Sequence, residues 1–161
     1  MHFLPQNTVY GLVFLMAAFG GLRTLTPLAV LSWATFKQRL HLQDTPFFFL
    51  GHIVSVVVFT LIAVGELIGD KLPTMASRKE PRGFLTRVFV GAFIGLVLCA
   101  AEGLSLPAGA GVGMFGAIAG TMLGYEVRVR SVKLLHVPDF VVALVEDAIA
   151  VGGCIWVVVH F

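Results

Sequence analysis

The stretch GELIGDKLPTMASRKEPRGFLTR, residues Gly65–Arg87, decides the fold of this chain, because it joins two long apolar segments through a charged loop. Glu66 and Asp70 close the first apolar segment four residues apart, so they share one face if the helix continues through both. Pro73 and Pro81 stop the helix and stiffen the loop, which also holds five lysines and arginines. This pattern is typical of a membrane protein at the bilayer surface.

The composition of the whole chain also indicates an integral membrane protein. Of the 161 residues, 58% are hydrophobic and 12% are charged, and the mean hydropathy is +0.95. Soluble domains are typically about half apolar and about a quarter charged. We therefore predict a single integral membrane domain over residues 1–161, with the lipid bilayer as its main partner and no nucleic-acid partner. The first ten residues lack the Lys or Arg of a signal peptide, so we expect the first apolar segment to be retained.

The apolar segments predict an all-α, polytopic membrane helical bundle with about five transmembrane helices. The predicted spans are about Val9–Phe36, Phe47–Gly69, Phe84–Ala101, about Val112–Tyr125 and Pro138–Phe161. Residues Gly20–Pro27 interrupt the first of them, with two glycines before Arg23 and a proline after it. This interruption favours a kinked or broken first helix with Arg23 inside the bilayer. One helix ending near Gly21, a re-entrant segment or two separate spans also fit the pattern.

Lysines and arginines outside the spans are divided unequally between the two sides of this bundle. With five spans, the N-terminus and the loops 70–87 and 126–137 lie together and hold eight of them, whereas the loops 37–46 and 102–111 hold two. The positive-inside rule then predicts cytoplasmic basic loops and a cytoplasmic N-terminus. A re-entrant or doubled first segment would move the N-terminus to the other side and leave the basic loops cytoplasmic.

Charged residues inside the spans require an explanation, because each costs at least about 2.5–3.5 kcal/mol at the bilayer centre. Glu146 lies eight residues after Pro138, roughly 12 Å along a helix and close to the middle of a core of about 30 Å. A pair of Arg23 with Glu146 or Asp147 is predicted, and it either locks the bundle or belongs to a binding site. Adjacent side chains point about 100° apart on a helix. One arginine therefore leaves the second carboxylate to water, another cation or a proton.

Two glycine stripes predict close helix packing. Gly91 and Gly95 have GxxxG spacing, and Gly116, Gly120 and Gly124 repeat every four residues. Such stripes let helix backbones approach each other where lipid gives no hydrophobic drive for association. We predict helix contacts within the chain, with an oligomer interface as the alternative.

Four motifs run in order through nearly the whole chain. They are GLRTLTPLAVLSW (Gly21–Trp33), ELIGDKLP (Glu66–Pro73), SRKEPRGFLTR (Ser77–Arg87) and LVEDAIAVGG (Leu144–Gly153). Together they resemble the DUF4126 family of small bacterial membrane proteins. The resemblance implies a multi-pass protein of the bacterial inner (plasma) membrane, but no reaction, because the family is functionally uncharacterised. Other members carry Leu-Asn-Ala in place of Leu22-Arg23-Thr24, so the resemblance does not extend to Arg23.

The sequence contains no motif that predicts an enzyme or a cofactor. HExxH, GxGxxG at a strand–helix junction and P-loop patterns are missing, and the five histidines are scattered rather than grouped as metal ligands. Kinked segments with carboxylates at membrane depth instead predict a small transporter or channel for an ion or small polar solute. Because the chain is short, a homo-oligomer is expected. The predicted site residues are Arg23, Glu66, Asp70, Glu146 and Asp147.

Two other functions stay open. One is a membrane-embedded enzyme acting on lipid phosphates, in which the carboxylates serve as acid and base and arginines hold the phosphate. The other is a scaffold that binds a partner membrane protein through the glycine stripe.

Overall fold

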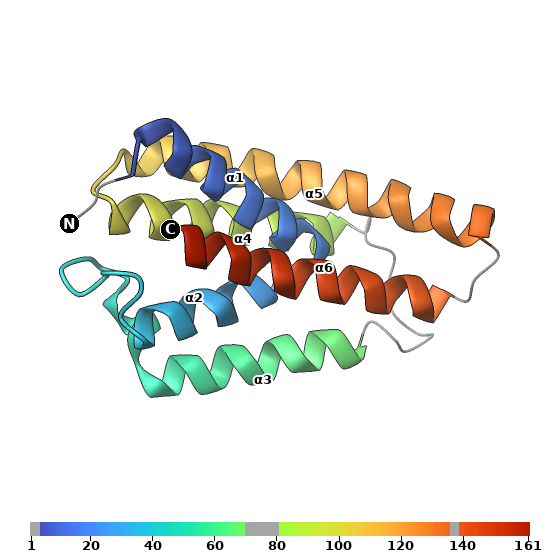
Figure 1. Ribbon diagram of the computed structural model, residues 1–161, viewed down its shortest axis with the longest axis horizontal. Coiled ribbons are helices and arrows are strands. Elements are labelled where there is room, and N and C mark those ends of the chain that lie inside the picture. Colours follow the sequence, from blue (N-terminus) through green and yellow to red (C-terminus); the bar gives the residue numbers. More distant parts are fainter. Residues whose placement is uncertain (1–3, 70–80, 136–138) are drawn as a thin grey trace.

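The computed structural model describes residues 4–69, 81–135 and 139–161, and every regular element in these ranges is helical (Figure 1). The elements are α1 (Gln6–Leu22), α2 (Thr26–Phe36), the 3-10 helix η1 (Phe48–Gly51), α3 (Ile53–Gly69), α4 (Pro81–Ala101), α5 (Leu106–Leu135) and α6 (Asp139–His160). The prediction of an all-α fold is confirmed. Within the described ranges, α4, α5 and α6 are long and apolar enough to cross a membrane, whereas α1, α2 and α3 are apolar but shorter.

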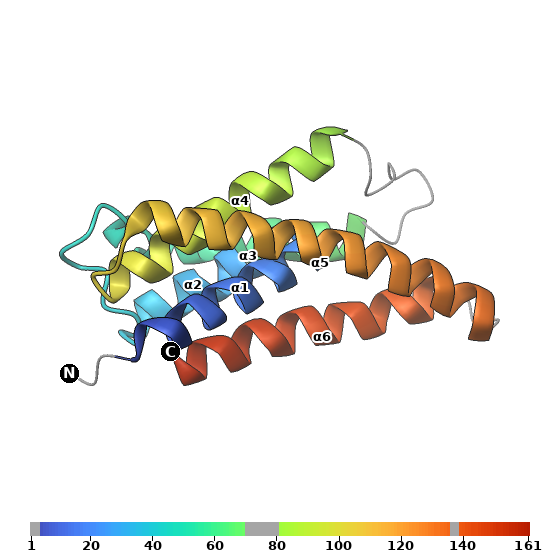
Figure 2. The same cartoon turned by 90° about the horizontal axis from the view of Figure 1, so that it is seen from above.

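The first predicted span is divided into two helices, of 17 and 11 residues, that form a hairpin. α1 runs inward from one end of the bundle, and α2 returns to the same end (Figures 1 and 2). Between them, Arg23 is extended, with φ −136° and ψ 107°, and Leu25 is the N-cap residue of α2. Pro27 lies in the first turn of α2, where its missing N–H removes no helical hydrogen bond. The prediction of a broken first helix is therefore confirmed.

The hairpin changes the expected arrangement of the chain ends. The five-span topology predicted that α1 starts at the end of the bundle that carries the basic loops. Instead, α1 starts beside the α4–α5 turn and the C-terminus (Figure 1). The ends of α3 and α5 and the starts of α4 and α6 lie at the opposite end of the bundle. The structure shows the alternative in which the first segment turns back, because α2 returns to the starting end instead of continuing through the bundle, and the start of α1 lies away from the basic loops.

α4 and α5 pack backbone against backbone through glycines. A Cβ atom on Gly95 would collide with the backbone of Gly109, and one on Gly91 would lie 2.6 Å from the carbonyl oxygen of Gly113. The partners Gly109 and Gly113 belong to α5, so both members of the predicted GxxxG pair face another helix of the same chain.

A second glycine contact joins α5 to α1. Cβ atoms on Gly116 and Gly120 would meet the backbone of Phe14 and Ala18, respectively. Thr121 adds a polar contact, because its hydroxyl lies 2.8 Å from the carbonyl oxygen of Ala117 and 3.3 Å from that of Gly21. α1 is thereby held against α5 as far as the hairpin turn.

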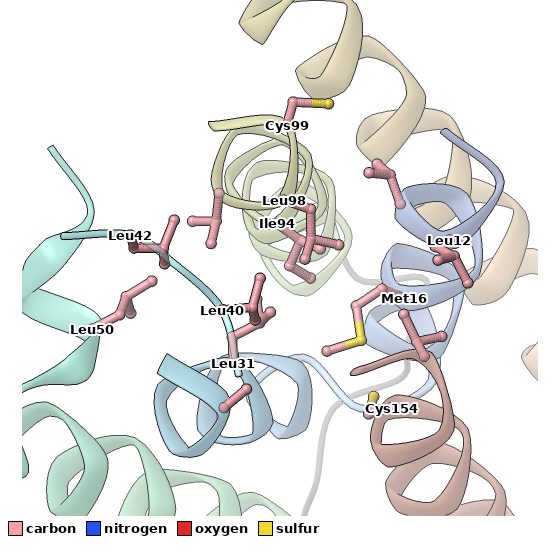
Figure 3. Packing of buried hydrophobic residues seen from close by; sticks show 14 of the residues in the cluster. Leu12, Met16, Leu31, Leu40, Leu42, Leu50, Ile94, Leu98, Cys99 and Cys154 are labelled. Atoms are coloured by element: carbon pink, nitrogen blue, oxygen red, sulfur yellow. The ribbon is translucent and has the colours of Figure 1, made fainter. Parts of the chain in front are cut away.

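The apolar core lies at the end of the bundle where the hairpin opens. Met16 of α1 packs near Ile94 and Leu98 of α4, and Leu40 and Leu42 of the segment after α2 enter the same cluster (Figure 3). On the other side of α2, the indole N–H of Trp33 donates a hydrogen bond of 3.0 Å to the hydroxyl of Thr60 in α3. The core and this bond fix the hairpin between α3 and the other helices.

Several predicted boundaries shift. α5 begins at Leu106 and continues to Leu135, so the predicted span at Val112–Tyr125 is too short and most of the predicted loop 126–137 is helix. Its charged residues suit a helix surface, as the i,i+4 pair of Glu126 and Arg130 at 3.3 Å shows. The helix of the second predicted span begins later than the predicted Phe47, because residues Phe48–Gly51 form η1 and α3 starts at Ile53.

Candidate functional site

A carboxylate from α3 holds the turn of the α1–α2 hairpin. The backbone N–H of Thr24 donates to Oε1 of Glu66 and that of Leu25 donates to Oε2, each over 2.8 Å. No side chain at the N-cap position bonds to the start of α2, and the first N–H groups of a helix have no partner within it. Glu66 therefore acts as a cap supplied by another helix, and its negative charge lies at the positive end of the α2 dipole.

Replacing Glu66 with glutamine is expected to lower the free energy of unfolding by about 1.5–3 kcal/mol, the range for hydrogen bonds to a charged group. The amide keeps one acceptor oxygen and places an NH2 group against the second backbone N–H. Thermal unfolding in detergent measures the loss. Glu126→Gln is the matched control, because the Glu126–Arg130 pair is exposed and such pairs are worth about 0.3–0.5 kcal/mol. Equal unfolding temperatures for the two variants would contradict the capping role.

The arginine of the hairpin turn is paired inside the bundle. Arg23 is fully buried, and its guanidinium forms an ion pair with the carboxylate of Asp147 in α6. Its backbone N–H donates a 2.9 Å hydrogen bond to the carbonyl of Phe19 and so closes the last turn of α1. A buried charge is tolerated only beside a counter-charge. This ion pair therefore connects α6 to the hairpin turn.

The neighbouring carboxylate of α6 faces a different arginine. Oε2 of Glu146 lies 3.6 Å from Nη1 of Arg128 in α5. This distance exceeds the roughly 2.7–2.9 Å of a charge-assisted hydrogen bond. The Arg128 side chain is 18% exposed, whereas that of Arg23 is 0% exposed. The contact of Glu146 is therefore longer than that of Asp147 and its arginine is more exposed, whereas the two carboxylates are buried to a similar degree.

The structure brings four of the predicted site residues to the region around the hairpin turn. Arg23 pairs with Asp147, one of the two predicted partners, and Glu146 lies beside them on α6. Glu66 was predicted at the mouth of the bundle, but it bonds to the turn itself. Asp70 lies outside the described residues. Among the residues that are described, no group of three or more His, Cys, Asp and Glu side chains is arranged to hold a metal ion.

Sequence reasoning missed Arg128, because it assigned the basic residues after Tyr125 to membrane topology. Two signals were available. The divergence of adjacent carboxylates on α6 left one of them to water, another cation or a proton. Arg128 also continues the four-residue spacing of Gly116, Gly120 and Gly124, so it lies on the face of α5 that those glycines define.

Comparison with known proteins gives a family and no characterised relative. The family model described as "Domain of unknown function (DUF4126)" matches residues 11–160. No curated protein and no solved structure matches the chain. The matched range includes the hairpin turn, Glu66 and both carboxylates of α6. The chain thus belongs to the DUF4126 family.

Proposed function

We propose that this chain is an integral membrane transporter or channel for an ion or a small polar solute. The hairpin turn carries the proposal. Two helices meet there, and a fully buried arginine and the backbone N–H groups of Thr24 and Leu25, just before α2, meet carboxylates from α6 and α3. Discontinuous helices that end at the bilayer midplane form the substrate and ion sites of many secondary transporters. Charged groups at that depth are costly in lipid and commonly mark a pathway.

The charge balance of the site favours a cation or a proton. Glu66, Glu146 and Asp147 carry three negative charges, against the two positive charges of Arg23 and Arg128. The start of α2 adds a partial positive charge of about one half. The excess negative charge of these groups lowers the free energy of a bound cation. Glu146 is the candidate for the exchanging group because its ion pair is the longer one.

We place the protein in the bacterial inner (plasma) membrane with its basic end in the cytoplasm. Eight of the eleven lysines and arginines fall within residues 70–87 and 126–137, which adjoin the ends of α3 and α5. The positive-inside rule assigns that end to the cytoplasm. Because the hairpin returns to its starting end, the start of α1 and the end of α6 are then external. We also propose that the protein is a homo-oligomer, because further copies would stabilise a bundle of this size and enclose the pathway.

Cysteine labelling tests the proposed orientation. Cys99 and Cys154 are buried, and replacing both with alanine gives the background for Arg130→Cys and Ser105→Cys. A membrane-impermeant maleimide added to intact spheroplasts is expected to label Ser105→Cys only, and to label both variants after permeabilisation. Labelling of Arg130→Cys alone in intact spheroplasts would reverse the orientation. Labelling of both would show that the chain does not span the membrane.

Replacing Glu146 with glutamine tests the transport proposal. The variant is expected to stay folded, because the amide preserves size and Arg128 is partly exposed. Its proton or cation flux is expected to fall roughly tenfold or more, because the amide cannot exchange a proton. Flux into proteoliposomes is measured with an entrapped pH dye or cation dye, beside thermal unfolding. Glu126→Gln serves as the control. If both variants keep wild-type flux and pH dependence, Glu146 is structural and the proposal loses its support.

A further inference from the structure

An apolar groove with a volume of about 330 Å³ lies between α5 and α6 beyond the hairpin turn. It exists because α1 stops at Leu22 while α5 and α6 continue (Figure 1). Ala18, Phe19 and Leu22 line the groove from α1, and the remaining lining residues come from α5 and α6. The volume falls within the range of about 300–1,000 Å³ that is typical of small-molecule sites.

The groove is apolar almost throughout, and the few charged or hydroxyl-bearing residues that line it include two near the end of α5. Its apolar walls include Leu123 and Val127 of α5 and Val145 and Ile149 of α6. Arg128, Ser131 and Glu146 are the charged and hydroxyl-bearing residues that line it. Arg128 and Ser131 lie on one face of α5 three residues apart, so the polar groups of α5 gather at one end. The groove thus combines long apolar walls with an arginine and a serine at one end.

The walls of the groove continue onto the outer surface of the bundle. Leu123, Val127, Val145 and Ile149 are between 52% and 65% exposed although all four are apolar. In a bilayer, such a face contacts lipid chains. Arg130 and Lys133 add positive charge near Arg128 at the same end of α5. Basic residues at the cytoplasmic surface attract anionic headgroups.

We infer that this groove binds an anionic phospholipid of the cytoplasmic leaflet, with an acyl chain along the apolar walls and the phosphate at Arg128 and Ser131. A guanidinium matches the geometry of phosphate oxygens, and a neighbouring hydroxyl donates a further hydrogen bond. The inference rests on the proposed membrane insertion and orientation but not on transport. The lipid would contact Arg128 directly and so lie beside the Arg128–Glu146 pair.

Lipid binding to the purified full chain tests the inference. Phosphatidylglycerol and phosphatidylcholine are titrated into the protein in detergent, and bound lipid is counted by native mass spectrometry. The wild type is expected to prefer phosphatidylglycerol. Arg128→Gln is expected to weaken phosphatidylglycerol binding by roughly tenfold or more, because a direct charge-assisted contact is lost. Arg130→Gln removes the same charge from an exposed position and is expected to weaken it by less than about threefold at 0.15 M salt.

Further variants keep the test decisive if Arg128→Gln does not fold. Arg128→Lys retains the charge and is expected to keep most of the preference for phosphatidylglycerol. Val142→Trp fills the groove and is expected to reduce binding of both lipids, whereas Val141→Trp, which is outside the lining, is not. Equal losses for Arg128→Gln and Arg130→Gln, full binding to Val142→Trp, or displacement of the lipid by inorganic phosphate would each overturn the inference. Flux is not part of these measurements, so a failure of the transport proposal leaves their outcome unchanged.

Discussion

Gly120→Ala is expected to lower the free energy of unfolding by about 3 kcal/mol or more, at the upper end of the cost of adding one methyl group to a packed site. The added Cβ would collide with the carbonyl oxygen of Ala18 and lie 2.7 Å from its carbonyl carbon and its Cα. All three atoms belong to the backbone of α1, so no side-chain rotation relieves the clash. α1 would have to move away from α5, and the hydrogen bond between Thr121 and Gly21 would be lost with it.

Gly111→Ala provides a matched control for this effect. Gly111 lies on the same helix, and a Cβ atom there would have no neighbour within 4 Å. Replacing a helical glycine with alanine normally stabilises a helix by up to about 1 kcal/mol. The two variants are therefore expected to differ in sign when unfolding is followed by circular dichroism in detergent. Equal stabilities would show that α1 and α5 are not in backbone contact.

The second large effect is expected at the buried pair of Arg23 and Asp147. Removal of either partner leaves a charge inside the bundle without its counter-charge, which costs about 3–5 kcal/mol. Arg23→Met and Asp147→Leu are each expected to lose that much stability. The double variant replaces both charges with apolar groups and is expected to recover most of the loss, because buried ion pairs are often matched by apolar residues. A double-mutant cycle of unfolding free energies measures the coupling.

This cycle separates stability from function at adjacent residues. If the double variant is folded and still transports, the ion pair is structural and Glu146 alone carries the exchange. A folded double variant without flux would assign the pair to the pathway. Additive losses, with no recovery in the double variant, would contradict the pairing of Arg23 with Asp147.

The break in the first helix was predictable, and the direction of the chain after it was not. Two glycines, an arginine and a proline within Gly20–Pro27 are local signals, and they act in the structure as the sequence indicates. A kinked span and a hairpin share these signals. The bonds from Thr24 and Leu25 to Glu66 join residues about forty positions apart, and no local pattern reveals such a contact.

Only part of the site was predicted, because its contacts also join residues that lie far apart in the sequence. The pairing of Arg23 with an acidic residue of α6 was predicted from the number of residues between each charge and the start of its predicted span. Arg128 was missed because charge is a poor marker of where a membrane helix ends. α5 continues past Arg128 to Leu135, and this continuation places the guanidinium against Glu146.

In the proposed membrane setting, the partners of the hairpin turn also order the assembly of the chain during synthesis. α1 and α2 leave the ribosome first, but the groups that hold their turn arrive later. Thr121 follows Gly21 by 100 residues, and Asp147 is later still. Until Asp147 emerges, the charge of Arg23 has no counter-charge, and a buried charge without one costs about 3–5 kcal/mol. We therefore expect the α1–α2 hairpin, which is synthesised first, to reach its final position last. A nascent chain arrested before α6 is expected to leave its hairpin at the membrane surface.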